Sequence, residues 1–226
     1  MTLTVHRDLV QCGAEWLAAR CGLLTASDMK RIITPKLAVA SNEAERAHLF
    51  ELLAQRITRY VEPTYISNDM LRGQEDEIEA RALYAQHYAP VQTCGLMVRD
   101  FGWGKIGYSP DGLVGDDGLI ECKSRRQRFH VETICQDEMP ADYHIQVQTG
   151  LLVSGRKWCD FISYSGGLPM CPIRVEVEPE VHSAILNAAQ AFEERLAMRM
   201  AQYRQAIKEN NLVATERRVA QEMFVL

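Results

Sequence analysis

The sequence predicts an α/β protein in which helices flank a central mixed β-sheet, and two observations lead to this prediction. Long runs with apolar residues at helical spacing alternate with short, strand-like runs. Two short apolar runs, 112–114 and 119–120, also flank a turn at Asp116, Asp117 and Gly118, which is the signal of a β-hairpin. The 226 residues contain no linker, repeat or low-complexity segment, so we expect one domain, 1–226.

Each element is predicted in order along the chain. Helices are expected at 15–20, 27–33, 42–60, 74–87, 128–135, 143–153 and 178–208. The helix at 42–60 rests on apolar residues that recur at roughly helical spacing, and Pro63 ends it. Strands are expected at 93–99, 104–108, 112–114, 119–123, 158–165 and 173–177, and these would form the mixed sheet.

The overall charge does not by itself indicate a nucleic-acid partner. The formal net charge is −5, and 47% of the residues are hydrophobic, as in an ordinary globular protein. Phosphate contacts nevertheless come from a few placed Lys and Arg side chains, and basic clusters occur at 30–31, 125–128 and 156–157. Solubility explains any one of these clusters alone. The cluster that starts at Arg125 differs, because it begins two residues after Lys123 and could line a DNA channel.

The seven cysteines argue against a disulfide framework and a zinc ribbon. Their number is odd and no two of them form a Cys-x-x-Cys pair, which favours reduced thiols in an intracellular protein, several of them facing the core. We find no signal peptide, no targeting motif and no apolar run long enough to cross a bilayer. We therefore expect no membrane partner.

The stretch Ser109-Pro110-Asp111-Gly112, followed by Glu121-Cys122-Lys123, predicts a metal-dependent hydrolytic site. Side chains alternate along a strand, so Glu121 and Lys123 would share one face and Cys122 would face the other. Asp111 and Glu121 offer the hard oxygen ligands that a divalent cation prefers. The alternative is an exposed hairpin with a solvated Glu–Lys pair. The second strand is otherwise apolar, which favours the site.

Phosphodiester hydrolysis needs a nucleophile in line with the leaving oxygen and stabilisation of negative charge. Two Mg²⁺ ions bridged by Asp111, with Mn²⁺ as a substitute, would meet both needs. Lys123 would position or deprotonate the attacking water. A lysine that acts as a base needs a lowered pKa, which nearby carboxylates oppose. Its role as a base or as an electrostatic clamp therefore stays open at the level of the sequence.

A second candidate site lies near the N-terminus. Residues 25–28 (Thr-Ala-Ser-Asp) look like a helix start capped by Thr25 or Ser27, and a helix N-terminus favours an anion. Arg20 adds a planar fork suited to phosphate, and Trp16 would share its helix face and lie beside the DNA end. The alternative is an ordinary capped helix with Arg20 on the surface and Trp16 in the core.

Five motifs follow one another along the chain. They are Trp16-x-x-x-Arg20-x-Gly22-x-x-Thr25-Ala26-Ser27, Gly73-x-x-x-Glu77, Ser109-Pro110-Asp111-Gly112, Glu121-x-Lys123 and Gln146-Val147-Gln148. Taken in this order, they resemble the lambda exonuclease family, also called YqaJ-like viral recombinases, of the PD-(D/E)xK nuclease superfamily. The resemblance spans roughly residues 12–200, and the ordered set is more specific than any one motif.

The resemblance implies an activity, a fold and partners. It implies a restriction-endonuclease-like nuclease core, with an N-terminal helical segment that binds DNA ends and a long C-terminal helix. It implies 5′→3′ degradation of one strand of linear double-stranded DNA to mononucleotides, which leaves a 3′ overhang. A ring-shaped homotrimer and a phage single-strand annealing protein would be the partners. The place would be the cytoplasm of a bacterial host, with a phage or prophage as the source.

The resemblance also implies roles for individual residues. Asp111, Glu121 and the backbone carbonyl of Cys122 would bind metal, with indirect support from Glu77. Lys123 would be the catalytic lysine, with Gln146 beside it. Arg20, Ser27 and Ser109 would hold a 5′-phosphate. Trp16, Thr25 and Arg125 would be further DNA-binding residues beside them.

Two other functions compete with the exonuclease. One is a structure- or site-specific DNA endonuclease on the same core, and the other is a binding module with a decayed site. The intact Asp111, Glu121 and Lys123 count against the decayed site, and the segment from Arg20 to Ser27 favours the exonuclease over the endonuclease. A related family with an iron–sulfur cluster is disfavoured by the spacing of the C-terminal cysteines. The apolar end, 223–226, is expected to pack on a neighbouring subunit or bind a partner.

Overall fold

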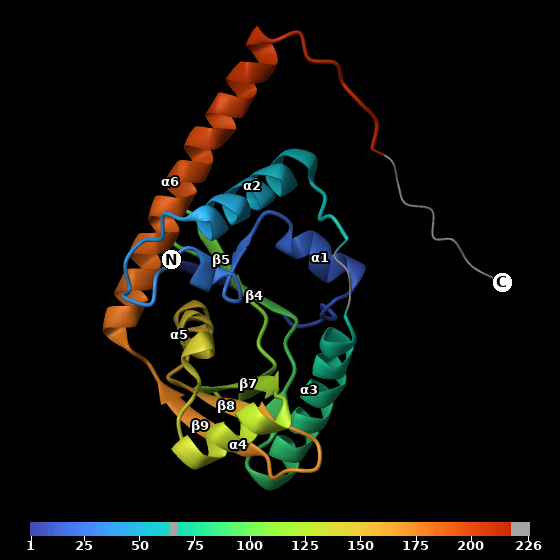
Figure 1. The fold of residues 1–226 in the computed structure, drawn as a ribbon, viewed down its shortest axis with the longest axis vertical. Coiled ribbons are helices and arrows are strands. Elements are labelled where there is room, and N and C mark those ends of the chain that lie inside the picture. Colours follow the sequence, from blue (N-terminus) through green and yellow to red (C-terminus); the bar gives the residue numbers. More distant parts are fainter. Residues whose placement is uncertain (64–66, 218–226) are drawn as a thin grey trace, which may run out of the picture.

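A computed structural model of the chain describes residues 1–63 and 67–217. The strands of these residues form two sheets (Figure 1). The first sheet has the order β1 (Thr2–His6), β4 (Leu96–Asp100), β5 (Lys105–Tyr108) and β2 (Leu24–Thr25). The second has the order β3 (Val91–Gln92), β6 (Gly112–Val114), β7 (Gly118–Ser124), β8 (Trp158–Tyr164) and β9 (Cys171–Glu176).

Helices surround these sheets, which confirms the α/β class. The helical elements are α1 (Ala14–Arg20), the 3₁₀ turn η1 (Met29–Arg31), α2 (Glu43–Thr58), α3 (Asn68–His87), α4 (Gln127–Gln136), α5 (Ala141–Ser154) and α6 (Pro179–Glu209). Both sheets are mixed, because β2 runs parallel to β5 and β7 runs parallel to β8 while the other pairs are antiparallel. Residues 109–111 carry the chain from β5 in one sheet to β6 in the other.

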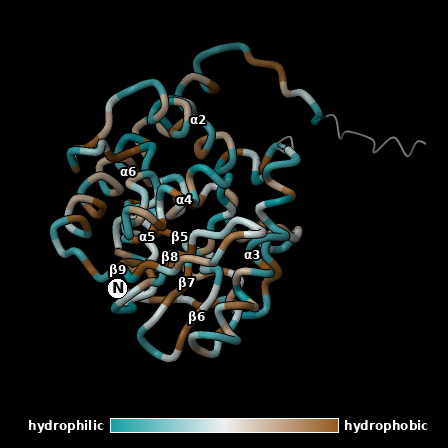
Figure 2. The backbone as a smooth tube through the Cα atoms, turned by 60° about the horizontal axis from the view of Figure 1, so that its bottom comes forward, coloured by the Kyte–Doolittle hydropathy of each residue, from teal (hydrophilic) through white to brown (hydrophobic). Residues whose placement is uncertain are grey.

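The five-stranded sheet is covered on both faces. On one face, a small hydrophobic cluster joins Ala80 and Tyr84 of α3 to alternate residues of β7, among them Cys122. On the other face, a larger cluster joins the sheets to α2, α5 and α6. In Figure 2 the hydrophobic stretches lie mainly in the central strands, and the loops around them are largely hydrophilic. The alternation along β7 thus sends Cys122 towards α3 and leaves Glu121 for the opposite face, as the sequence predicted.

The predicted hairpin forms as β6 and β7, with its turn at residues 115–117. Gly115 takes a φ of +50°, a conformation that favours glycine. Gly118, expected in the turn, is instead the first residue of β7 and pairs with Val114. A Cβ at Gly118 would meet the Trp158 ring at 2.2 Å, so only glycine fits under this tryptophan.

The predicted helix at 27–33 is wrong. Only the 3₁₀ turn at Met29–Arg31 forms there, and no side chain caps it. The reason is tertiary: Leu24 and Thr25 pair as a strand with Ile106 and Gly107, and the amide of Ala26 donates to the Gly107 carbonyl. The side chain of Thr25 donates to the carboxylate of Asp28 at 2.8 Å instead of capping the backbone.

Three strands and the early start of α3 were not predicted. β1 is held by antiparallel pairing with β4, while β2 and β3 are only two residues long and exist through their pairing with β5 and β6. α3 begins at Asn68, where Ser67 accepts a hydrogen bond from the Met70 amide and so caps it. The last turns of α6 extend beyond the body of the protein (Figure 1).

Within the described residues, no helix is both long and apolar enough to cross a membrane. All seven cysteines are free, and Cys94, Cys122 and Cys159 are buried, in agreement with the expectation of reduced, core-facing thiols. The apolar end at 223–226 lies outside the described residues.

Candidate active site

Asp111 and Glu121 lie side by side where the two sheets meet. Asp111 precedes β6 and Glu121 is within β7, and the register that pairs Gly112 with Ile120 brings the two carboxylates opposite each other. Only 6% of Asp111 and 1% of Glu121 is exposed. The hairpin therefore holds two carboxylates together inside the protein.

Polar groups from three elements surround these carboxylates. The backbone amide of Cys122 donates to Oδ2 of Asp111 at 2.6 Å. Glu121 accepts from the Tyr108 hydroxyl at 3.0 Å through Oε2, and from the Lys123 ammonium at 2.6 Å through Oε1. The side-chain amide of Gln146, on α5, donates to the same Oε1. The predicted residues Glu121, Lys123 and Gln146 are thus in direct contact.

Burial and like charge disfavour the state in which Asp111 and Glu121 are both ionised. Burial raises the pKa of Asp111 well above its usual value, and the charge of Glu121 raises it further. Burial alone would lower the pKa of Lys123, but the charges of Glu121 and Asp111 outweigh it and raise that pKa. Among the described residues, the ammonium form of Lys123 is therefore favoured.

The donor set fits a hard divalent cation. Among the described residues, no group of three or more His, Cys, Asp and Glu side chains is arranged to hold a metal. Asp111 and Glu121 nevertheless present carboxylate oxygens to one another in a region of low dielectric, and a divalent cation relieves the repulsion that raises the pKa of Asp111. These two carboxylates and the Cys122 carbonyl would hold the ion, with help from Glu77.

Glu77 approaches the same site from α3. Burial raises its pKa, the charges of Arg81 and Lys123 lower it, and the charge of Glu121 raises it. Arg81 pairs with Glu77 at 3.4 Å and donates to the backbone carbonyl of Asp111 at 2.9 Å. Arg81 therefore ties α3 to the start of β6.

Arg81 and Tyr108 are the site residues that the sequence analysis missed. Arg81 lies four residues after Glu77, on the same helix face, and this spacing was the available signal. Tyr108 immediately precedes the Ser109 motif, but nothing in the sequence tells a core tyrosine from one that donates to a catalytic carboxylate.

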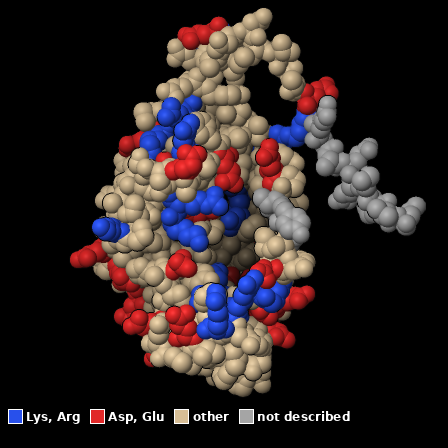
Figure 3. Space-filling view, in the orientation of Figure 1, with Lys and Arg blue, Asp and Glu red and all other residues tan. Residues whose placement is uncertain are grey.

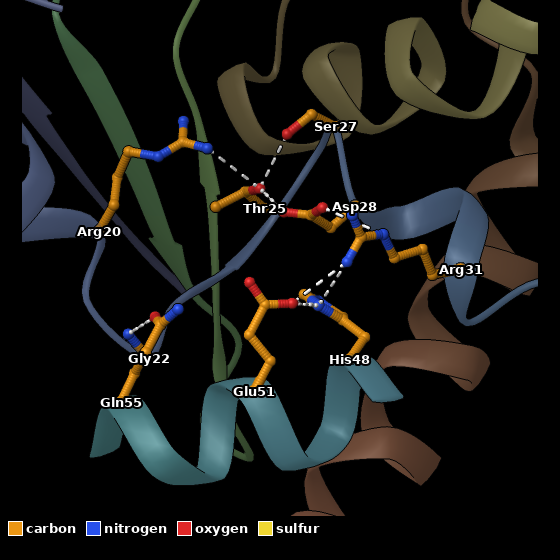
Figure 4. Close-up of polar contacts among 9 residues, drawn as sticks. All are labelled: Arg20, Gly22, Thr25, Ser27, Asp28, Arg31, His48, Glu51 and Gln55. Atoms are coloured by element: carbon orange, nitrogen blue, oxygen red, sulfur yellow. Dashed lines mark hydrogen bonds and ion pairs between the residues drawn. The ribbon is translucent and has the colours of Figure 1, made fainter. Parts of the chain in front are cut away.

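The second predicted site also comes together. Trp16 Nε1 donates to Ser109 Oγ at 2.9 Å, and the Arg20 guanidinium lies 4.1 Å from the Trp16 ring. Arg20 donates to Ser109 Oγ at 3.3 Å and to Thr25 Oγ1 at 3.4 Å. Thr25 and Ser27 hydroxyl oxygens are 3.1 Å apart (Figure 4). We call Trp16, Arg20, Thr25, Ser27 and Ser109 the arginine cluster.

A further layer of polar groups extends behind the arginine cluster towards α2 (Figure 4). Arg31 pairs with Asp28 at 3.5 Å and with Glu51 at 3.2 Å, and Glu51 also contacts His48. Burial lowers the pKa of Arg20 and Asp28 raises it, although a guanidinium stays protonated in either case. Because Arg31 pairs with Asp28, that carboxylate is partly neutralised beside Arg20.

The predicted anion site is built from side chains and not from a helix N-terminus. The helix N-terminus expected at Thr25–Ser27 is wrong, so a helix dipole does not contribute there. Anion binding at this point would rest on side chains, namely the Arg20 guanidinium and the hydroxyls of Ser27 and Ser109. Trp16 lies outside the hydrophobic core and is half-buried between Arg20 and Ser109, so its default placement in the core is also wrong.

Basic side chains border a hollow in the face seen in Figure 3. They gather above and below it, in the part of the molecule where Figure 1 places the junction of the two sheets. Arg125 directly follows β7, and its backbone amide donates to the Tyr164 carbonyl at 2.7 Å.

The chain is similar to a known protein family and to solved structures. The family model of the YqaJ-like viral recombinase domain matches residues 15–157. A solved structure of an alkaline exonuclease, LHK-Exo, from Laribacter hongkongensis is 35% identical, with a TM-score of 0.77, over 87% of this chain and 99% of that chain. The same exonuclease in complex with dAMP is 34% identical, with a TM-score of 0.77, over 87% of this chain and 99% of that chain.

A more distant structure supports the fold alone. It is a phage related exonuclease from Haemophilus somnus 129PT, 13% identical, with a TM-score of 0.56, over 79% of this chain and 96% of that chain. No curated protein matches the chain significantly.

Proposed function

The chain belongs to the YqaJ-like viral recombinase family, and from this premise we propose that it is a Mg²⁺-dependent exonuclease. It degrades one strand of linear double-stranded DNA in the 5′→3′ direction and releases mononucleotides. The remaining 3′ overhang serves recombination by single-strand annealing. The similarity to an alkaline exonuclease at 35% identity supports the proposal that this chain, too, is a nuclease acting on DNA from its ends.

One observation supports an exonuclease most directly: Ser109 belongs to the arginine cluster, and only Pro110 separates it from Asp111. Two residues span at most about 7 Å, a length comparable with one nucleotide. A terminal phosphate held by Arg20 and Ser109 would therefore place the next phosphodiester beside Asp111 and Glu121. An enzyme that cuts within a strand has no need of such a pocket.

The residues of the site would divide the work as follows. Bound Mg²⁺, in two ions per site and replaceable by Mn²⁺, would activate water and neutralise charge on the phosphate. Tyr108 and Gln146 hold both oxygens of Glu121 in a fixed orientation. Lys123, held as an ammonium, would stabilise the negative charge that develops on the reacting phosphate.

A gel assay with linear and covalently closed circular duplex DNA tests this function. We expect the linear DNA to be degraded from its 5′ ends in Mg²⁺, with mononucleotides as the product, while the circle stays intact. Cutting of the circle would instead establish an endonuclease. Binding of both DNAs without cutting in Mg²⁺ or Mn²⁺ would contradict any nuclease.

We also propose that the protein assembles as a ring-shaped homotrimer and acts beside a phage single-strand annealing protein in the bacterial cytoplasm. A ring that encloses its DNA would remain bound between successive cuts. Multi-angle light scattering should therefore give a mass near three times that of the chain. A stable monomer at micromolar concentration would contradict the assembly and the processive degradation that depends on it.

A further inference from the structure

A groove of about 550 Å³ opens beside Lys123. Its lining includes Arg125, Arg126 and Phe129 after β7, Tyr143 at the start of α5, and Arg72 on α3. A second hollow of about 670 Å³ shares three of these arginines and continues it. We call the first hollow the aromatic groove. Because Ser124 also lines it, the groove begins at the residue after Lys123.

Aromatic rings and guanidinium groups alternate in the aromatic groove. The Arg125 guanidinium lies 5.5 Å from the ring of Phe129 and 5.5 Å from that of Tyr143, and Arg128 lies 4.2 Å from the ring of Phe129. Tyr143 packs on the buried Phe161 at 5.2 Å, whereas Phe129 is 37% exposed. Tyr143 is therefore anchored, whereas part of the Phe129 ring is exposed to solvent beside the two guanidinium groups.

The charges in the aromatic groove do not suit a tightly held polyanion. Three arginines are balanced by three carboxylates, those of Asp69, Glu132 and Asp142. Asp69 is paired with Arg72 at 3.2 Å and with Arg126 at 3.0 Å. Arg125 makes no ion pair with any described residue, and its buried Nε has no hydrogen-bond partner among them. One phosphate on Arg125 and one base on an aromatic face match this arrangement.

The aromatic groove and the arginine cluster belong to different sheets, which meet at residues 109–111. The arginine cluster is attached to the four-stranded sheet through β2 and Ser109, while the groove belongs to the five-stranded sheet and to α4. Figure 1 shows α1 and α4 on opposite sides of the sheet junction. A strand whose end is held by Arg20 and which passes the carboxylates would continue into the groove.

We infer that the aromatic groove binds unpaired nucleotides of the strand under degradation, beyond the bond to be cut, and stacks a base on Phe129. This inference rests on the proposed function. Bases inside a duplex stack on one another and expose no face, so beyond the terminal base pair a ring stacks on an unpaired base. Stacking tolerates any base sequence, which suits an enzyme that must move along its substrate.

A thermodynamic cycle between the DNA and Phe129 tests the inference. The probe is a 5′-phosphorylated duplex with a short single-stranded 5′ end, in which one base at a time is replaced by an abasic site. Its affinity is measured by fluorescence anisotropy in Ca²⁺. In the unmodified protein, we expect an abasic site at one or two positions near the end to weaken binding roughly five- to a hundredfold. In Phe129→Ala the same abasic site should cause almost no further loss.

Matched variants separate stacking from folding. Phe129→Trp should restore the sensitivity to the abasic site, and Phe129→Leu, which keeps an apolar side chain, should not. Phe50→Ala is the control, because Phe50 is an exposed aromatic residue with Arg199 at 6.0 Å from its ring but lies on α2. It should behave like the unmodified protein.

An equal loss at every abasic position in the unmodified protein and in Phe129→Ala would overturn the inference. The cycle measures binding, whereas the gel assay measures hydrolysis, so the two failures can be told apart. Degradation of linear DNA without coupling at Phe129 would refute the groove and leave the exonuclease standing. Coupling at Phe129 without any hydrolysis would refute the exonuclease and keep the groove as a site for unpaired nucleotides.

Discussion

The carboxylate site and the arginine cluster are assembled in opposite ways. Asp111 and Glu121 come from one hairpin and are almost fully buried, and this burial, together with the charge of Glu121, raises the pKa of Asp111. The arginine cluster comes from α1, β2 and the β5–β6 connection, and the side chain of Arg20 contacts those of Thr25 and Ser109. The first site thus holds two like charges together, while the second already joins a cationic side chain to two hydroxyl groups.

The largest expected effect is the loss of hydrolysis when a residue of the carboxylate site is replaced. Asp111→Ala, Glu121→Ala and Lys123→Ala should each lower hydrolysis roughly a thousandfold, because each takes away a group that stabilises charge in the reaction. The release of mononucleotides from labelled linear duplex measures this loss, and the circular dichroism spectrum should stay unchanged. Full activity in any of the three variants, or activity of the unmodified protein in excess chelator, would contradict the assignment of hydrolysis to the carboxylate site.

A smaller effect is expected at the arginine cluster. Linear duplex with a 5′-phosphate should be degraded faster than the same duplex with a 5′-hydroxyl, and Arg20→Ala should erase most of this preference. A charge-assisted hydrogen bond contributes about 1.5–3 kcal/mol, roughly ten- to a hundredfold in rate. The rate on 5′-hydroxyl ends should hardly change, because the carboxylate site is intact.

Lys30→Ala is the matched control for Arg20→Ala. Lys30 is exposed and lies in η1, next to Arg31, so its loss changes the local charge without touching the arginine cluster. It should keep the preference for the phosphorylated end. Equal rates on both kinds of end in the unmodified protein would refute the phosphate pocket, and an endonuclease would become the better interpretation.

The smallest expected effect is on stability, and it tests whether the buried charge of Asp111 destabilises the folded protein. The pKa of Asp111 is raised in the folded protein, so its ionised form is destabilising, and the stability that its protonated form provides is lost as the pH rises through that pKa. Asp111→Asn should therefore raise the melting temperature in chelator at neutral pH by a few degrees, since 1 kcal/mol corresponds to about 2–4 °C at this size.

Asp116→Asn, in the exposed turn of the same hairpin, is the control for this shift and should leave the melting temperature unchanged. Mg²⁺ should then raise the melting temperature of the unmodified protein but not that of Asp111→Asn, because binding to the folded state alone stabilises it. If Asp111→Asn melts at a lower temperature than the unmodified protein in chelator, the ionised carboxylate does not destabilise the folded protein.

The carboxylate site is the part of the molecule that local sequence patterns predict best. Strand alternation places Glu121 and Lys123 on one face, and the hairpin register brings Asp111 to Glu121; both follow from residues close together in the chain. The helices at 42–60, 128–135 and 143–153 also appear close to where apolar spacing predicts them. Such patterns act over a few turns or pleats, so a single segment contains the whole signal.

The arginine cluster and its surroundings depended on the tertiary structure. Sequence motifs identified Trp16, Arg20 and Ser109 separately, but only the packing of α1 against residues 95 and 109 brings them into contact. The same kind of long-range pairing holds Leu24 and Thr25 in a strand just before the expected helix at 27–33, where only a 3₁₀ turn forms.

By itself, then, the sequence predicted the α/β class, the hairpin and the residues that meet in the candidate hydrolytic site, because hydrophobic periodicity and turn chemistry are local properties. Only the tertiary structure decided that the strands divide into two sheets, that Tyr108 and Arg81 support the carboxylates, and that the aromatic groove opens beside Lys123. These features arise where segments distant in the chain meet. Their positions are set by the packing of whole elements, which no single stretch of residues specifies.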